Sequence, residues 1–178
     1  MMTDPFRLAL ILGGAKSGKS RYGLSLAQGF PAPRLLVATG EARDVEMAAR
    51  IARHRLERGP EWETREEPLN LKDALTASQG RYGVIVVDCL TLWLSNLMLR
   101  EDQGSGIEAE CLQLLEVLKN TATPAIFISN EVGWGIVPEN ALARAFRDRA
   151  GRLHQCLAQL ADLVVLVAAG LPLTLKGN

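Results

Sequence analysis

Residues 13–20 carry the residue types that bind phosphate groups. They read Gly-Gly-Ala-Lys-Ser-Gly-Lys-Ser and match the pattern G-x-x-x-x-G-K-[ST] at every fixed position. Glycines let the backbone curl closely around phosphate oxygens, and amides at the start of a following helix point at the anion. In such a loop Lys19 reaches the β- and γ-phosphates of a nucleoside triphosphate, and the Ser20 hydroxyl ligates Mg²⁺. The predicted nucleotide cradle comprises Gly13, Gly14, Ala15, Lys16, Ser17, Gly18, Lys19 and Ser20.

A carboxylate further along the chain supports this interpretation. Asp88 ends the apolar run Val-Ile-Val-Val that begins at Val84. An apolar strand that ends in a carboxylate is the arrangement that holds Mg²⁺, directly or through water, beside a phosphate-binding loop. We therefore expect Ser20 and Asp88 to share one metal ion.

His54 is one of only two histidines in the chain. On an expected helix over residues 44–59 it lies opposite the apolar stripe, with Arg50 and Arg58 nearby. Two interpretations stay open at this level. His54 is either a solvated surface residue or a nucleophile whose neutral imidazole attacks phosphorus while the arginines offset phosphate charge. His154, at the edge of an apolar stripe on the last expected helix, is interpreted as structural.

An α/β fold must position these residues. Short apolar runs alternate with longer amphipathic stretches, which is typical of a mainly parallel sheet covered by helices. The expected strands are 6–12, 34–38, 84–88, 125–129 and 163–168, with weaker candidates at 62–65 and 171–175. The expected helices are 19–28, 44–59, 70–77, 90–100, 107–120 and 139–161, the last with Pro138 at its start. The sequence predicts a P-loop NTPase (RecA-like) three-layer fold.

Composition limits the classes of function. The 178 residues favour a single domain over 1–178, and 20 basic residues balance 20 acidic ones, which argues against nucleic-acid binding. Three widely spaced cysteines argue against a disulfide framework or a zinc site and for a reducing compartment. No apolar run reaches transmembrane length. We expect a cytoplasmic protein without a membrane span.

Four sequence strings together resemble one family. They are residues 13–21, residues 47–51 followed by His54-Arg55, residues 88–93, and residues 129–140 with a continuation at 146–148 and 151–152. The fourth string is the most specific, because many families share the phosphate-binding loop. From Leu10 to about Lys176 the chain resembles the bifunctional adenosylcobinamide kinase/adenosylcobinamide-phosphate guanylyltransferase of cobalamin biosynthesis.

The resemblance implies two reactions that use ATP and GTP as substrates. A hydroxyl on the aminopropanol arm of adenosylcobinamide first takes a phosphoryl group from ATP or GTP. GTP then donates GMP to that phosphate, which gives adenosylcobinamide-GDP and releases pyrophosphate. The resemblance further implies that this second reaction passes through a guanylylated histidine at the position of His54, and that the protein is a homo-oligomer such as a trimer.

Other site residues are implied by the same matching. The positions that resemble guanine-nucleotide contacts are Ala38, Thr39, Gly40, Arg55, Leu56, Glu57, Arg58, Glu66 and Asp88. The Glu66 carboxylate can accept hydrogen bonds from guanine N1 and N2, although the sequence alone favours a solvent-facing glutamate beside Glu67. Asn130 and Glu131 are assigned to corrinoid binding or loop positioning, the alternative being a turn whose side chains cap the backbone. The resemblance leads us to expect arginine at position 16, where this chain has lysine. Lys16 keeps the positive charge but lacks the planar guanidinium group that can bind a phosphate through two hydrogen bonds.

Two other functions are alternatives to the bifunctional kinase and guanylyltransferase. The first is a monofunctional P-loop small-molecule kinase that forms no covalent nucleotide. The second is a nucleotide switch that binds GTP and presents loops to a partner, although the chain lacks the Asn-Lys-x-Asp pattern of guanine-specific switches.

Overall fold

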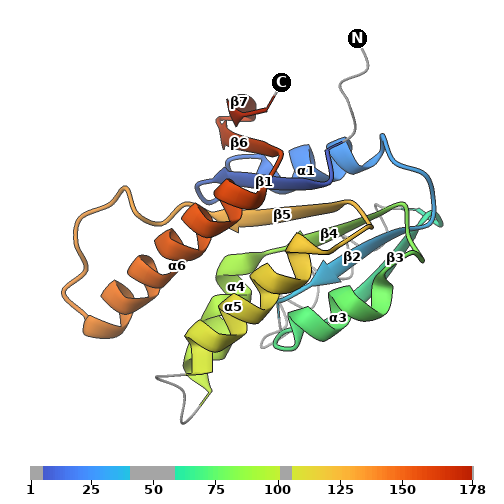
Figure 1. Cartoon of the computed structure of the whole chain (residues 1–178). Coiled ribbons are helices and arrows are strands. Elements are labelled where there is room, and N and C mark those ends of the chain that lie inside the picture. Colours follow the sequence, from blue (N-terminus) through green and yellow to red (C-terminus); the bar gives the residue numbers. More distant parts are fainter. Residues whose placement is uncertain (1–5, 41–58, 101–105, 178) are drawn as a thin grey trace.

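A single seven-stranded sheet forms the centre of the computed structural model, which describes residues 6–40, 59–100 and 106–177. The strands lie in the order β3-β2-β4-β5-β1-β6-β7 (Figure 1). They are β1 (Leu8–Gly13), β2 (Arg34–Ala38), β3 (Trp62–Glu66), β4 (Val84–Asp88), β5 (Ala125–Asn130), β6 (Leu163–Ala168) and β7 (Leu171–Lys176). The first six run parallel, and β7 pairs antiparallel with β6. The predicted mainly parallel sheet is confirmed.

Helices cover both faces of the sheet. They are α1 (Lys19–Ala27), α3 (Leu71–Ser78), α4 (Leu90–Leu99), α5 (Gly106–Lys119) and α6 (Ala141–Leu160). Figure 1 shows α1 on one side of the sheet and α3, α4, α5 and α6 on the opposite side. Within β1, Ala9 and Ile11 belong to the core on the α1 side, whereas Leu8 and Leu10 belong to the larger core. This period-2 division produces the predicted three-layer fold.

Burial on both sides explains why the central strands read as continuous apolar runs. In β4, for example, Val84 and Val86 face the α1 side, while Ile85 and Val87 face the larger core. The buried Trp93 fits this apolar setting because its indole nitrogen donates a hydrogen bond of 2.8 Å to the Leu69 carbonyl. None of the helices in the described ranges is long and apolar enough to cross a membrane.

The start of the last helix differs from the sequence prediction. Helix α6 begins at Ala141, because the Asn140 side chain caps it by accepting a hydrogen bond of 3.1 Å from the Ala143 amide. The prediction that Pro138 occupies the helix start was therefore wrong, since it lies in the preceding loop. Leu142, in the first turn of α6, is exposed rather than packed in the core. The helix expected over 44–59 falls almost entirely outside the described residues.

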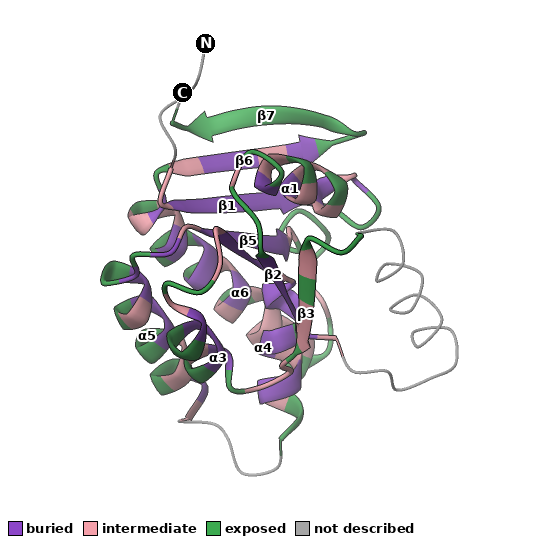
Figure 2. Ribbon diagram, turned by 90° about the vertical axis from the view of Figure 1, so that its right-hand side faces the viewer, coloured by how far each residue is buried: buried purple, intermediate pink, exposed green. Residues whose placement is uncertain are grey.

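Strand β7 closes one edge of the sheet and is exposed along its whole length (Figure 2). Its leucines at 171, 173 and 175 alternate with Pro172, Thr174 and Lys176. The Lys176 ammonium donates hydrogen bonds of 2.9 Å to the Ala158 and Gln159 carbonyls at the end of α6. A cation on the last carbonyls of a helix is favourable, and here it ties the edge strand to the helical layer.

The cap of α6 provides a test of the fold. We expect Asn140→Ala to lower the free energy of unfolding by about 1 kcal/mol, because the amide at the helix start loses its acceptor. Asn140→Asp keeps a capping oxygen and serves as the matched control. Urea denaturation of the three proteins measures the difference. Equal stability of Asn140→Ala and wild type would show that the cap contributes nothing.

Candidate nucleotide site

The turn between β1 and α1 is shaped to surround an anion. Lys16 and Gly18 both have left-handed backbones, with φ of 56° and 96°. The Ser17 amide closes the turn with a 3.2 Å hydrogen bond to the Gly14 carbonyl. Successive residues of opposite backbone handedness turn their amides toward a common point, which forms an anion-binding concavity. A side chain at Gly13 would collide with the Ser17 hydroxyl and the Val167 carbonyl, so only glycine fits there.

Two side chains of this loop fit a bound phosphate. Lys19 is largely buried, and its ammonium donates a 3.1 Å hydrogen bond to the Gly14 carbonyl, so the side chain folds back over the loop. The Ser17 hydroxyl is buried and has no hydrogen-bond partner among the described residues. Buried polar atoms are nearly always paired in folded proteins. An unpaired hydroxyl and a cation at the same loop are consistent with a ligand that supplies phosphate oxygens.

A turn from the far end of the chain supports the loop. Ala169 and Gly170, both with positive φ, join β6 to β7. The Gly170 amide donates a 2.8 Å hydrogen bond to the Ser17 carbonyl, and a side chain added at Gly18 would lie 3.2 Å from the Gly170 Cα. This support was not predicted from the sequence. Its signal was a short turn containing glycine between two apolar runs.

The donors for a metal ion are one hydroxyl and one carboxylate. Ser20 is the second residue of α1, Asp88 is the last residue of β4, and both are half-buried. Oxygen donors are the ligands that Mg²⁺ prefers, and it commonly completes its shell with substrate phosphates and water. Within the described ranges no group of three or more histidine, cysteine or acidic residues could hold a metal. The two oxygens therefore fit a Mg²⁺ ion that arrives with a nucleotide.

A polar network fixes the neighbouring strand ends. The Thr39 hydroxyl donates a 2.7 Å hydrogen bond to the Cys89 carbonyl and accepts one of 2.8 Å from the Cys89 amide. The Asn96 amide group donates to the Thr39 carbonyl at 2.8 Å, and that of Asn130 donates to the Thr91 hydroxyl at 2.9 Å. The network joins the carboxyl ends of β2, β4 and β5. Satisfied buried networks of this kind hold a unique geometry.

Cys89 belongs to this network as a structural thiol. Burial raises the pKa of its thiol, the Asp88 carboxylate adds to that effect, and hydrogen bonding from Thr91 opposes it. A raised pKa keeps the sulfur protonated and unreactive. The positive charge of Lys19 also lowers the pKa of the Cys89 thiol. The Lys19 ammonium therefore lies close enough to the end of β4 to act on it electrostatically.

Several predicted contact residues line up along the carboxyl edge of the sheet. Ala38 pairs with Asp88 on one side and with Glu66 on the other, and Gly13 pairs with Asn130. The edge therefore runs Gly13, Asn130, Asp88, Ala38, Glu66. Adjacent strands lie about 4.8 Å apart, so β1 and β2 are about 14 Å apart across the sheet. Because Asp88 pairs with Ile128, Asn130 and Gly13 lie two residues beyond the row that Asp88, Ala38 and Glu66 form.

Some of the other predicted nucleotide-contact residues are described by the structure, and some lie outside the described residues. Thr39 is fully buried with its hydroxyl engaged by Cys89, Gly40 is half-buried, and Glu66 is exposed at the end of β3. The predicted nucleophile and its neighbours lie outside the described residues: His54, Arg55, Leu56, Glu57 and Arg58.

A second polar group lies just beyond β5. The Glu131 amide donates a 3.0 Å hydrogen bond to the Gly13 carbonyl, and one carboxylate oxygen accepts a 2.7 Å bond from the Gly133 amide. Behind it, the buried His154 shares a 2.7 Å hydrogen bond between its Nε2 and the Ser129 hydroxyl. The His154 Nδ1 lies 3.9 Å from the other Glu131 oxygen, which is longer than a hydrogen bond. These contacts give Glu131 a loop-positioning role.

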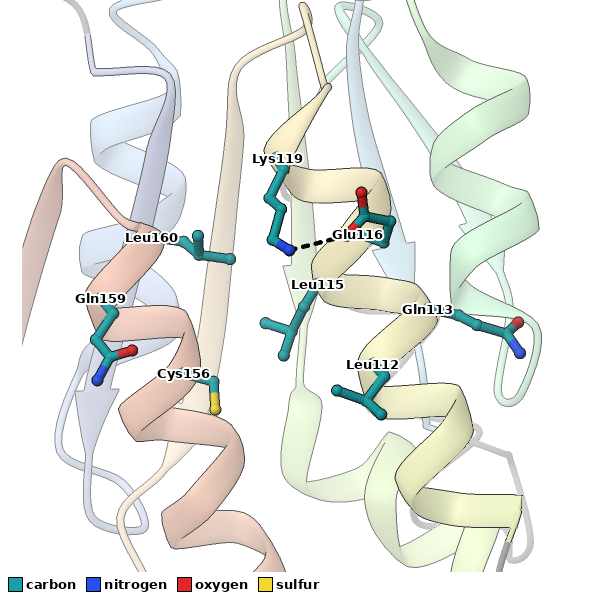
Figure 3. A pocket seen from close by; sticks show the side chains of 8 residues that line it. All are labelled: Leu112, Gln113, Leu115, Glu116, Lys119, Cys156, Gln159 and Leu160. Atoms are coloured by element: carbon teal, nitrogen blue, oxygen red, sulfur yellow. Dashed lines mark hydrogen bonds and ion pairs between the residues drawn. The ribbon is translucent and has the colours of Figure 1, made fainter.

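One surface groove lies away from this edge. It has a volume of about 450 Å³ and runs between the C-terminal halves of α5 and α6 (Figure 3). It is lined by Leu112, Gln113, Leu115, Glu116, Lys119, Cys156, Gln159 and Leu160. Helices that return between parallel strands end at the amino edge of the sheet, which is opposite the P-loop. The groove therefore does not adjoin the nucleotide site.

Sequence comparisons point to one family. The model of a family described as cobinamide kinase/cobinamide phosphate guanyltransferase matches residues 9–175. The bifunctional adenosylcobalamin biosynthesis protein CobP of Pseudomonas aeruginosa is 45% identical over 169 residues, which span 95% of this chain and 97% of the relative. The bifunctional adenosylcobalamin biosynthesis protein CobU of Salmonella typhimurium is 37% identical, over 95% of this chain and 99% of its own.

Solved structures with similar folds are more distant. The flagellar accessory protein FlaH of Methanocaldococcus jannaschii superposes with a TM-score of 0.56 at 14% identity, covering 98% of this chain and 80% of that one. The RadB recombinase gives a TM-score of 0.51 at 17% identity, covering 89% and 73%. These likenesses confirm the predicted P-loop NTPase fold and carry nothing about function.

The buried His154 predicts a pH dependence of stability. Burial lowers its pKa from the ordinary 6.5, against an opposing effect of Glu131. The native state thus favours the neutral ring. The contribution of His154 to the free energy of unfolding is fully present above pH 6.5 and is lost as the pH falls through the lowered pKa of the folded state. We expect His154→Gln to make the free energy of unfolding vary less over that interval. Urea denaturation at a series of pH values measures it.

The matched control for this experiment is His54→Gln, which removes the other histidine. It should keep the wild-type pH profile. If it flattens the profile as much as His154→Gln does, the assignment to the buried ring is wrong.

Proposed function

Because the chain belongs to the cobinamide kinase/cobinamide phosphate guanyltransferase family, we propose that it phosphorylates adenosylcobinamide and then guanylylates the product. ATP or GTP supplies the phosphoryl group, GTP supplies GMP, and the final product is adenosylcobinamide-GDP. One observation carries the proposal. In a chain matched by this family over residues 9–175, the P-loop contains the folded-back Lys19 and a buried Ser17 hydroxyl that has no hydrogen-bond partner in the described part of the chain.

The geometry of the loop supports the kinase step. The acceptor hydroxyl oxygen bonds to the γ-phosphorus, the bond to the bridging oxygen breaks, a nucleoside diphosphate leaves, and the hydroxyl proton passes to solvent. Lys19 and the loop amides hold the transferring phosphate and offset its charge, which is where most of the catalysis of phosphoryl transfer arises. Ser20 and Asp88 would hold Mg²⁺, which neutralises charge on the β- and γ-phosphates.

One nucleotide position is proposed to serve both steps. An extended nucleotide with its phosphates at the P-loop has its base reaching along the sheet edge past Asp88 toward Ala38 and Glu66. The register of β2 with β3 and β4 supports this path, since it aligns these residues in one row. Glu66 then accepts hydrogen bonds from the guanine N1 and N2 groups, which adenine lacks.

The guanylyl transfer is proposed to proceed through His54, on the strength of the resemblance. An imidazole nitrogen attacks the α-phosphorus of GTP, and pyrophosphate leaves. A phosphate oxygen of adenosylcobinamide phosphate then attacks the same phosphorus, the P–N bond breaks, and the histidine is regenerated. Splitting one transfer into two in-line steps is the usual advantage of covalent catalysis.

Three further expectations remain proposals. Residues 1–178 act as one nucleotide-binding transferase domain, the protein works as a homo-oligomer such as a trimer, and it acts in the cytoplasm. The free state of Cys89, Cys111 and Cys156 supports a reducing compartment.

The covalent step can be tested by incubating the protein with Mg²⁺ and GTP labelled at the α-phosphorus, followed by denaturation and mass analysis. We expect an acid-labile GMP adduct on wild type and on His154→Gln, and none on His54→Ala. His154→Gln is the matched control because it removes the other histidine. An adduct that persists in His54→Ala would place the nucleophile elsewhere. No adduct in wild type that binds GTP would leave a P-loop kinase.

Lys19→Ala, assayed in the same series, should lower kcat/KM of adenosylcobinamide phosphorylation by roughly a hundredfold or more, because a preorganised charge on the transferring phosphate is lost. His54→Ala should retain this activity. Loss of phosphorylation in a folded His54→Ala would contradict separable steps.

The base contact can be tested with Glu66→Gln. Replacing a charged acceptor by an amide weakens its hydrogen bonds, so the preference for GTP over ATP in adduct formation should fall by roughly tenfold or more. Glu63→Gln, on the same strand, is the matched control. An unchanged preference in Glu66→Gln would remove this residue from base recognition.

A further inference from the structure

The segment that follows β5 and Glu131 presents apolar side chains to solvent. We call residues 132–137 the apolar loop. Its exposed fractions are 36% for Val132, 79% for Trp134, 96% for Ile136 and 61% for Val137. Single exposed apolar residues are ordinary, but four within six consecutive positions form a patch of the kind that marks a binding surface.

Polar contacts hold the apolar loop at both ends. At its start the Glu131 carboxylate accepts the Gly133 amide at 2.7 Å, and any side chain at Gly133 would crowd that oxygen at 2.9 Å. Beyond its end the Arg144 guanidinium donates to the Pro138 and Glu139 carbonyls at 2.9 and 2.5 Å. The loop is thus ordered by hydrogen bonds, while its large side chains stay unburied. Preorganised apolar surface binds with a smaller entropy loss than a surface that must first be ordered.

The apolar loop begins beside the phosphate cradle. Gly13 pairs with Asn130, and the Glu131 amide donates to the Gly13 carbonyl at 3.0 Å. Figure 1 shows the segment between β5 and α6 projecting from the edge of the sheet where β1 passes into α1. A molecule resting on the apolar loop therefore lies next to the position where phosphates are transferred.

We infer that the apolar loop is the docking surface for the corrin ring of the acceptor substrate, with the Trp134 indole against one face of the ring. This inference rests on the proposed function. A corrin is a broad macrocycle with methyl groups on its faces and amides at its rim, so it matches a flat apolar platform beside polar backbone. Tryptophan offers a large rigid apolar area with few rotors, which suits it to such a contact.

Glu131 is a positioning residue in this arrangement. It touches the apolar loop through Gly133 and the P-loop through Gly13, so it sets the docking surface relative to the phosphate cradle. The buried His154 ring lies behind its second oxygen.

The test measures kinase kinetics with adenosylcobinamide and ATP for wild type, Trp134→Ala and Leu112→Ala. Leu112 is the matched control, because it is a similarly exposed apolar residue in the groove between α5 and α6. We expect Trp134→Ala to raise KM for the corrinoid roughly ten- to hundredfold, the range of a buried aromatic contact, with KM for ATP within about twofold. Leu112→Ala should match wild type. Equilibrium dialysis with adenosylcobinamide alone should show the same loss of affinity.

A second pair of variants examines positioning. Glu131→Ala should raise KM for the corrinoid much as Trp134→Ala does, because the loop loses its anchor. Glu131→Gln should restore near wild-type values, since its amide oxygen still accepts the Gly133 amide.

Three results would overturn the inference. An unchanged corrinoid KM in Trp134→Ala, with active wild type, would leave the proposed function standing without this docking surface. Sedimentation that shows Trp134→Ala dissociating an oligomer, with a normal corrinoid affinity, would assign the loop to a second copy of the chain. Wild type that neither binds nor phosphorylates adenosylcobinamide would remove the proposed function and this inference together.

Discussion

The site depends on the position of β1 between β5 and β6. Parallel pairing on both sides buries this strand and sets the height at which it ends, with Gly13 level with Asn130 on one side and Val167 on the other. Only glycine fits at this point, because the Val167 carbonyl and the Ser17 hydroxyl leave no room for a side chain at Gly13. Ligands of open parallel sheets bind outside the carboxyl ends of the strands. The phosphate cradle is thus a consequence of strand register as much as of its own glycines.

Beside the cradle, the structure uses two opposite ways of ordering a segment. The ends of β2, β4 and β5 are held by buried side chains such as Thr39 and Asn96, whose hydrogen bonds are satisfied within the fold. The loop after Glu131 is held by hydrogen bonds while leaving Trp134 in solvent. The first arrangement fixes geometry, which phosphoryl transfer needs to align its reacting atoms. The second keeps apolar area available without letting it collapse into the core.

Local sequence patterns predicted much of this molecule. The P-loop motif, the apolar runs and the helices carry their signals within a few residues, and the three-layer fold followed from them. The Gly170 support of Ser17 and the His154–Ser129 bond were not predicted, because each joins segments that are distant in sequence. The hydrogen bond from the Thr39 hydroxyl to the Cys89 carbonyl was not predicted for the same reason. Even the start of α6 was missed, since a strong Asn140 cap outweighed the suitability of Pro138 for a helix start.

The support of the cradle by the turn at Ala169-Gly170 also bears on the order of folding. Strand β1 is synthesised early, yet it pairs with strands that leave the ribosome much later, and its loop is braced by a turn near the end of the chain. Contacts between distant segments form slowly because loop closure must precede them. A nascent chain therefore carries its phosphate motif long before it can bind a nucleotide. Once the last hairpin docks, nucleotide binding favours the completed fold by mass action, so the substrate itself stabilises the newly made enzyme.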